Sequence, residues 1–186
     1  MKLWWFVFLL AFTPFTGLQR IALRNQYAQQ AEEAYNQKRY QEAAFLYEKV
    51  RQAEKDDVNP SVQLNLAHSY FHLRDYSRAY PLYKPLLNAH DISIRSMVAG
   101  QLAVIEADGG NYLKALALCK QALTTDETNT VARYNYELIQ KYLMLHPEKR
   151  KGPSPPQKRK QAQQKGGSSK VDPQGASATR LSLIHI

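Results

Sequence analysis

A twelve-residue pattern occurs three times in this chain, at a constant spacing of 36 residues. The copies are RYQEAAFLYEKV (39–50), DYSRAYPLYKPL (75–86) and NYLKALALCKQA (111–122). A fixed period of this length is typical of repeat proteins, in which each copy forms one small structural unit that packs on its neighbours. The period therefore restricts the fold to an array of similar units.

The residue types within each period indicate pairs of helices. The second residue of each copy is a tyrosine, an alanine follows three residues later, and an aromatic or small residue follows after four more, so these positions share one side of a helix. Alanine allows two helix backbones to approach closely, and a larger side chain there would overpack the contact. The positions predicted to hold the helix pairs together are Ala31, Tyr40, Ala43, Tyr47, Ala67, Tyr76, Ala79, Tyr83, Ala103, Tyr112, Ala115 and Cys119.

The predicted fold is all-α, with three helical hairpins and one capping helix. Asp75 and Asn111 suit the start of a helix, and Pro60 suits a first helical turn. Residues 128–145 read as the capping helix, which Pro147 ends. We expect its apolar stripe to cover the last helix pair; the stripe consists of Val131, Tyr134, Leu138, Tyr142 and Leu145.

The two ends of the chain differ from the repeats. Residues 1–18 contain one lysine and then about fifteen mostly apolar residues, which predicts a signal peptide or signal anchor with an apolar helix. The predicted repeat domain covers 19–146, with repeats at about 24–57, 60–91 and 96–127 and the capping helix at 129–146. The single cysteine, Cys119, excludes an intramolecular disulfide and is expected to be a small buried residue.

The C-terminal residues 147–186 form a basic tail that we expect to be disordered. They are rich in Pro, Gln, Gly, Ser and Lys, and carry nine Lys and Arg against Glu148 and Asp172. The last six residues, LSLIHI, resemble the translation of a sequencing adapter, so we expect the natural chain to differ there.

The periodic segments resemble tetratricopeptide repeats, most closely in LNLAHSYFHLRDYSRAYPLYKPLL (64–87). Four residues depart from that pattern: Gln30, Pro81, Pro85 and Glu106, of which Pro85 is expected to kink its helix. The resemblance implies a concave surface that binds other proteins. Its candidate groove residues are Glu32, Tyr35, Leu64, His68, Phe71, His72, Val104 and Asp108.

No enzyme is expected, and no catalytic residue, cofactor or metal site is predicted. His68 and His72 have zinc-compatible spacing, but HSYFH lacks the glutamate of a hydrolytic zinc helix. A third ligand would have to come from Glu32 or Asp108. Polar contacts within the groove are the favoured interpretation of the two histidines.

A narrower resemblance concerns cellular context. The apolar start, the segment ARYNYEL (132–138) and the Pro/Gln/Lys-rich tail resemble the Bat-type aerotolerance proteins of Gram-negative bacteria. This resemblance implies a scaffold in the periplasm or anchored to the inner membrane, with von Willebrand-type protein partners and membrane association through the N-terminus. The alternative is a cytosolic or nuclear adaptor whose KRK clusters (149–151 and 158–160) contact nucleic acid or anionic surfaces, although no aromatic residues interleave these clusters, which makes nucleic acid an unlikely partner.

Overall fold

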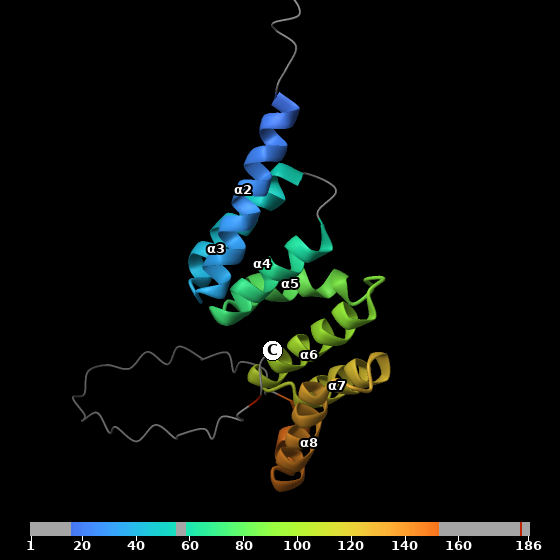
Figure 1. Cartoon of the computed structure of the whole chain (residues 1–186). Coiled ribbons are helices and arrows are strands. Elements are labelled where there is room, and N and C mark those ends of the chain that lie inside the picture. Colours follow the sequence, from blue (N-terminus) through green and yellow to red (C-terminus); the bar gives the residue numbers. More distant parts are fainter. Residues whose placement is uncertain (1–15, 55–58, 153–182, 184–186) are drawn as a thin grey trace, which may run out of the picture. The chain divides into compact units, whose positions relative to one another are not determined.

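The structure, a computed structural model, describes residues 16–54, 59–152 and 183, and helices account for most of them (Figure 1). No strand occurs in these ranges, so the predicted all-α fold of helical hairpins is confirmed. The elements are α2 (Thr16–Asn36), α3 (Tyr40–Glu54), α4 (Pro60–His72), α5 (Tyr76–Leu86), α6 (Ile92–Asp108), α7 (Tyr112–Thr125), α8 (Thr130–Leu145) and the 3₁₀ helix η1 (Pro147–Lys151).

The helices form two compact units, Met1–Ala89 (unit 1) and His90–Ile186 (unit 2). In unit 1, α2 packs on α3, α3 on α4, and α4 on α5. In unit 2, α6 packs on α7, and α8 packs mainly on α7 and to a smaller extent on α6. Among the described residues, unit 1 thus contains two helical hairpins, whereas unit 2 contains one hairpin, α8 and the short η1.

The three hairpin turns share one backbone conformation. Lys38, Arg74 and Gly110 lie 36 residues apart and have positive φ angles of 61°, 58° and 80°. After each of them, the next backbone N–H donates to the carbonyl five residues earlier. These bonds are Arg39 to Ala34 (2.8 Å), Asp75 to Tyr70 (2.9 Å) and Asn111 to Glu106 (2.8 Å). The 36-residue period therefore extends to the turns, where a left-handed residue closes each helix.

Side chains cap the N-termini of α4, α5, α6 and α8. Asn59 accepts from the N–H of Ser61 before α4, which begins at Pro60 as the sequence predicts. Asp75 accepts from the N–H of Arg78 before α5. Asn111 makes no such cap before α7, and its amide instead donates to the Glu106 carboxylate at 2.9 Å. Asp75 therefore has its predicted role, while Asn111 links α7 to α6.

Helix α5 contains Pro81 and Pro85 and, at 11 residues, is the shortest α-helix of those described. A proline has no N–H, so each removes one bond of the helical ladder. The sequence predicts a kink at Pro85, and the structure ends the helix one residue later, at Leu86.

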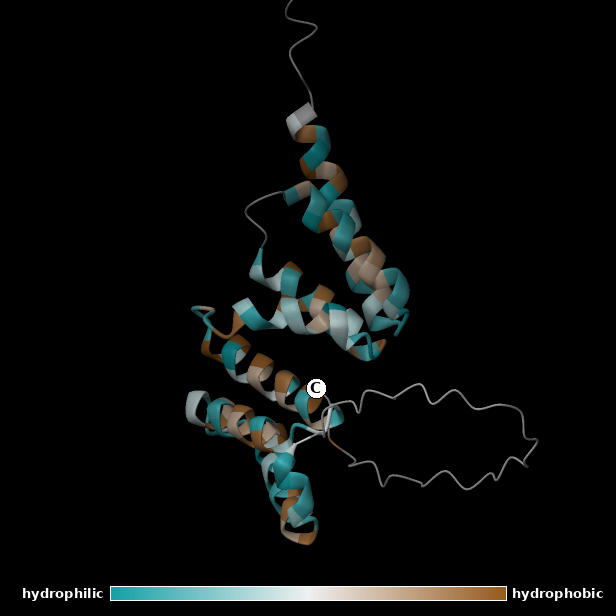
Figure 2. Ribbon diagram, turned by 180° about the vertical axis from the view of Figure 1, so that it is seen from behind, coloured by the Kyte–Doolittle hydropathy of each residue, from teal (hydrophilic) through white to brown (hydrophobic). Residues whose placement is uncertain are grey.

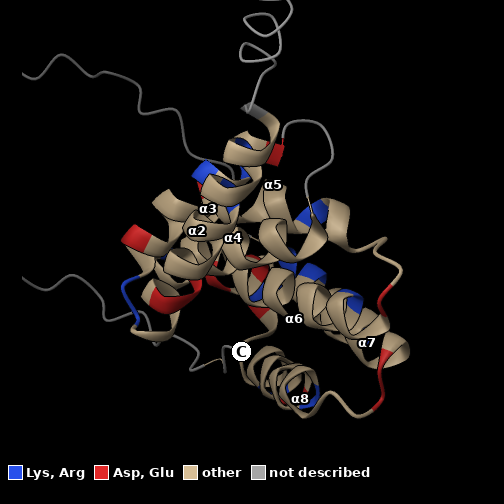
Figure 3. Ribbon diagram, turned by 45° about the horizontal axis from the view of Figure 1, so that its top comes forward, with Lys and Arg blue, Asp and Glu red and all other residues tan. Residues whose placement is uncertain are grey.

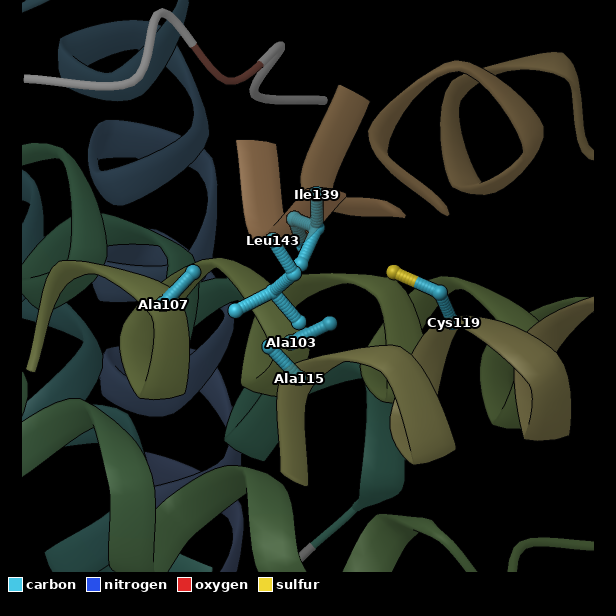
Figure 4. Packing of buried hydrophobic residues seen from close by; sticks show 6 residues of the cluster. All are labelled: Ala103, Ala107, Ala115, Cys119, Ile139 and Leu143. Carbon is cyan, nitrogen blue, oxygen red and sulfur yellow. The ribbon is translucent and has the colours of Figure 1, made fainter. Parts of the chain in front are cut away.

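Small residues lie where the helices of unit 2 meet. Figure 4 shows Ile139 and Leu143 of α8 pointing toward Ala103 of α6 and Ala115 of α7, in one buried cluster. Cys119 belongs to the same cluster, and its burial raises the pKa of the thiol to about 12. The single cysteine is thus packed as a small apolar group.

The capping helix packs through a different face than the sequence suggests. Its buried residues are Ala132, Asn135, Ile139 and Leu143. The predicted stripe lies beside this face, and its Tyr134 and Leu145 are 46% and 68% exposed. The stripe therefore covers the last hairpin only in part, through residues such as Tyr142, whose ring contacts Tyr112 of α7. Ala132 and Asn135 are smaller than the tyrosines of the stripe, and they let α8 approach the hairpin more closely.

The ends of the repeat domain differ in detail from the predicted ranges. Helix α2 begins at Thr16 and runs through the predicted boundary after residue 18, and α6 begins at Ile92, before position 96. Residues 1–15 of the predicted signal segment, and most of the predicted tail, lie outside the described residues. Leu183, which belongs to the segment LSLIHI, packs against the unit 2 cluster. In the described ranges, no helix is long and apolar enough to cross a membrane.

Candidate protein-binding site

Helix α4 supplies most of the candidate site. It contains no Lys, Arg, Asp or Glu and appears tan along its length in Figure 3. Its His68 and Phe71 are buried and its His72 is half-buried. An uncharged helix with imidazole and phenyl rings on one side favours aromatic packing and hydrogen bonding over charge recognition.

His68 forms a buried hydrogen bond with a tyrosine from α5. Its Nδ1 lies 2.6 Å from the hydroxyl oxygen of Tyr83, which is itself fully buried. Burial, reinforced by the neighbouring His72, lowers the pKa of His68 to about 4. Burial also raises the pKa of the Tyr83 hydroxyl. Both groups are therefore neutral near pH 7, and the bond joins two uncharged side chains.

His72 connects three helices of unit 1. Its ring stacks on Tyr40 of α3, with centroids 4.3 Å apart and an interplanar angle of 11°. Its Nε2 lies 3.1 Å from the hydroxyl oxygen of Tyr35 on α2. Burial raises the pKa of Tyr35 to about 12, with smaller contributions from Tyr40 and Tyr47. This hydroxyl consequently stays protonated and available for hydrogen bonding.

Phe71 joins the two histidine contacts into one group. Its ring centroid lies 6.0 Å from that of His72, 5.6 Å from Tyr76 and 6.2 Å from Tyr83. Edge-to-face and tilted contacts at these distances are favourable for aromatic rings. We call this group the histidine–tyrosine cluster; its members are Tyr35, Tyr40, His68, Phe71, His72, Tyr76 and Tyr83.

A hollow of about 640 Å³ opens beside the cluster. It is lined by Lys38, Arg39, Tyr40, Gln41, Glu42, Phe45 and Leu73. Tyr40 belongs to both the hollow and the cluster, while Phe45 is 61% exposed and Leu73 is 39% exposed. Apolar side chains exposed at the rim of a hollow are typical of a surface that binds another molecule.

The structure brings four of the predicted groove residues together: Tyr35, His68, Phe71 and His72. Leu64 lies on the same helix and is buried, and Glu32 is exposed on α2. Val104 is buried and Asp108 is exposed, and both belong to unit 2. The role of all eight residues in binding stays a prediction.

Sequence reasoning assigned Tyr40, Tyr76 and Tyr83 to packing between helices and did not connect them with the site. It also missed Phe45 and Leu73. Phe45 follows Ala43 and Ala44 off the periodic side of its helix, so a large apolar side chain at a solvent-facing position was the available signal. The tyrosine contacts depend on how separate helices meet, for which the sequence holds no comparable signal.

The ring nitrogens of the two histidines are directed to different tyrosines, His68 to Tyr83 and His72 to Tyr35. No group of three or more His, Cys, Asp or Glu side chains placed to hold a metal ion occurs within residues 16–54 and 59–152. The histidine–tyrosine cluster offers hydrogen bonding and aromatic contact, and the hollow adds the charged side chains of Lys38, Arg39 and Glu42.

Comparison with known families identifies the repeats. A family model described as anaphase-promoting complex, cyclosome, subunit 3 matches residues 36–106, which is less than half of the chain. The match covers α3 to α5 and most of α6, so it contains the α4–α5 hairpin whole and one helix of each neighbouring hairpin. This match, together with the helical hairpins, supports a tetratricopeptide-type repeat protein. The comparison with curated proteins found no match.

Proposed function

We propose that this tetratricopeptide-type protein is a non-enzymatic scaffold that binds a partner protein at the hollow beside the histidine–tyrosine cluster. The exposed Phe45 and Leu73 carry the proposal, because both line this hollow together with Tyr40. Tyr40 is held in place by stacking on His72, so one wall of the hollow is rigid before a partner arrives. A preformed apolar surface loses less conformational entropy on binding.

We further propose that the protein acts in the bacterial cell envelope, either in the periplasm or anchored to the inner membrane. The apolar run in residues 1–18 and the resemblance of ARYNYEL and the tail to Bat-type proteins support this location. The same resemblance supports von Willebrand-type partners and an assembly concerned with aerotolerance.

Site-specific photo-crosslinking tests the binding surface. A photoreactive residue at position 45 should capture a defined partner in a Gram-negative host, and Leu73→Glu should abolish that capture. The matched control places the photoreactive residue at position 113, because Leu113 is 54% exposed but lies on α7. Equal capture at positions 45 and 113 would contradict the proposed surface.

Two further measurements separate the location and the partner from the surface. Membrane fractionation with N-terminal sequencing should find an exported or membrane-bound chain, and a soluble cytosolic chain with an intact N-terminus would contradict the envelope assignment. Titration of a purified von Willebrand-type domain should give binding that Phe45→Glu removes. If that domain does not bind while position 45 still captures another protein, the partner class is wrong and the scaffold function stands.

A further inference from the structure

In the part of the chain that the structure describes, helix α8 has no antiparallel partner helix of the kind that α2, α4 and α6 possess. Within the described residues, α2 packs on α3, α4 on α5 and α6 on α7, whereas α8 is followed by the short η1. The buried face of α8 is already used by α6 and α7. The apolar stripe beside that face is only partly covered by the described residues.

The stripe is partly exposed along its length. Tyr134 and Leu145 are 46% and 68% exposed, and Val131, Leu138 and Tyr142 are half-buried. Tyr142 is fixed by a ring contact to Tyr112 of α7, with centroids 4.9 Å apart. An apolar stripe at this spacing on one helix is typical of a surface that packs against a second helix.

The spacing of the stripe is symmetric about Leu138. Val131 and Leu145 lie seven residues before and after it, and Tyr134 and Tyr142 lie four residues before and after it. A helix with this property is complementary to an antiparallel copy of itself. Leu138 would meet Leu138 at the two-fold axis, Tyr134 would face Tyr142, and Val131 would face Leu145.

We propose that two copies of this chain associate through the α8 stripe, in antiparallel orientation about Leu138. Such an arrangement gives a closed two-fold dimer, in which one patch serves both copies. The charged residues beside the stripe suit this pairing. Glu137 of one copy comes within one helical turn of the oppositely charged Lys141 of the second copy. Since α8 has only 16 residues, the interface is small, and we expect a weak dimer that forms as the concentration rises.

Sedimentation velocity of the full chain in detergent micelles tests the association. The wild-type chain should shift from monomer to dimer with concentration, and Leu138→Glu should weaken the dimer by about tenfold or more, because two carboxylates then meet at the axis. Met144→Glu is the matched control, since Met144 is 74% exposed on the same helix but lies outside the stripe. A wild-type monomer at every concentration, or equal dimerisation of Leu138→Glu and Met144→Glu, would overturn the proposal.

Cysteine crosslinking tests the geometry without burying a charge. Leu138→Cys should form a disulfide-linked dimer under an added oxidant, while Gln140→Cys, which is exposed on another side of α8, should not. A mixture of Val131→Cys and Leu145→Cys chains should form mixed dimers in preference to dimers of either variant alone. Equal crosslinking at positions 138 and 140, or a preference for unmixed dimers, would refute the antiparallel pairing. The buried Cys119 is not expected to compete.

Discussion

Beside its buried alanines, unit 1 packs a group of aromatic and imidazole rings, whereas the corresponding cluster of unit 2 consists of alanines, Ile139, Leu143 and a thiol. Figure 2 shows the difference in hydropathy, with α6 of unit 2 coloured brown at many positions and the helices of unit 1 carrying more teal and white. Positions in the α4–α5 hairpin of unit 1 have counterparts 36 residues later in unit 2. The hydrogen-bonded pair His68 and Tyr83 becomes Val104 and Cys119 one period later.

This correspondence distinguishes two kinds of position within one repeat: the alanines at the helix crossings and the variable positions beside them. The alanines at the helix crossings are kept in both units and are buried, as Ala79 and Ala115 illustrate. The neighbouring positions change from a polar pair to an apolar pair while the backbone stays the same. The repeat therefore specifies the hairpin through its alanines, and the variable positions determine whether a hydrogen-bonded pair or an apolar pair lies beside them.

The largest expected effect comes from the apolar core of unit 2. Ile139→Ala should lower the free energy of unfolding by about 2–5 kcal/mol, because Ile139 is fully buried and the surrounding helices can close the cavity only in part. Urea unfolding followed by circular dichroism measures the change. Leu145→Ala is the control on the same helix and should change stability by less than about 0.5 kcal/mol, since its side chain is exposed.

Unit 1 should respond to pH through His68. The pKa of this residue is lowered to about 4 in the folded chain, so the unfolded chain binds the proton more readily below its ordinary value of 6.5. The contribution of neutral His68 to the free energy of unfolding is therefore complete above pH 6.5. As the pH falls toward 4, this contribution decreases by roughly 3 kcal/mol. Urea unfolding at several pH values should show this loss in the wild type and a smaller loss in His68→Gln. Identical pH profiles for the two proteins would exclude His68 as the source.

Removing one hydroxyl tests whether the polar pair acts as a unit. Tyr83→Phe leaves the buried Nδ1 of His68 without its partner, which should cost about 1–3 kcal/mol of unfolding free energy. The double variant His68→Val with Tyr83→Phe imitates the apolar pair of unit 2 and should recover part of this loss. Additive effects of the two substitutions in denaturant unfolding would show that the pair is not coupled.

The smallest expected effect concerns the turns. Gly110→Arg places a side chain at a φ of 80° and should cost about 1 kcal/mol, because residues other than glycine are strained there. Arg74 already occupies the equivalent position of unit 1, so Arg74→Gly should leave stability unchanged or raise it slightly. Thermal unfolding midpoints of the two variants provide the comparison, and a destabilised Arg74→Gly would reveal a role for that side chain outside the turn.

The sequence predicts the helices well because the same pattern occurs three times. Where one repeat leaves a helix boundary ambiguous, the same position in the other two repeats resolves it. The alanine positions follow from the same register. The capping helix was harder, because it occurs once and carries two candidate apolar faces, and the face with Ala132 and Asn135 looked less apolar than the one with Tyr134 and Leu138.

The candidate site was predictable only in part. Helical spacing places His68 and His72 on one side of α4, so this part of the site follows from the sequence. Their tyrosine partners lie 15 and 37 residues away along the chain, on other helices. Such pairings depend on the angle and height at which helices pack, and residue spacing along one helix contains no information about either.

The common turn conformation at Lys38, Arg74 and Gly110 also bears on how such a chain can change its length. The three turns have the same backbone geometry. An additional block of 36 residues inserted at one of them would therefore connect to the helices on either side without altering them. Duplication or loss of a whole block is therefore mechanically simple for this protein, whereas an insertion of any other length would have to be accommodated by a rebuilt loop.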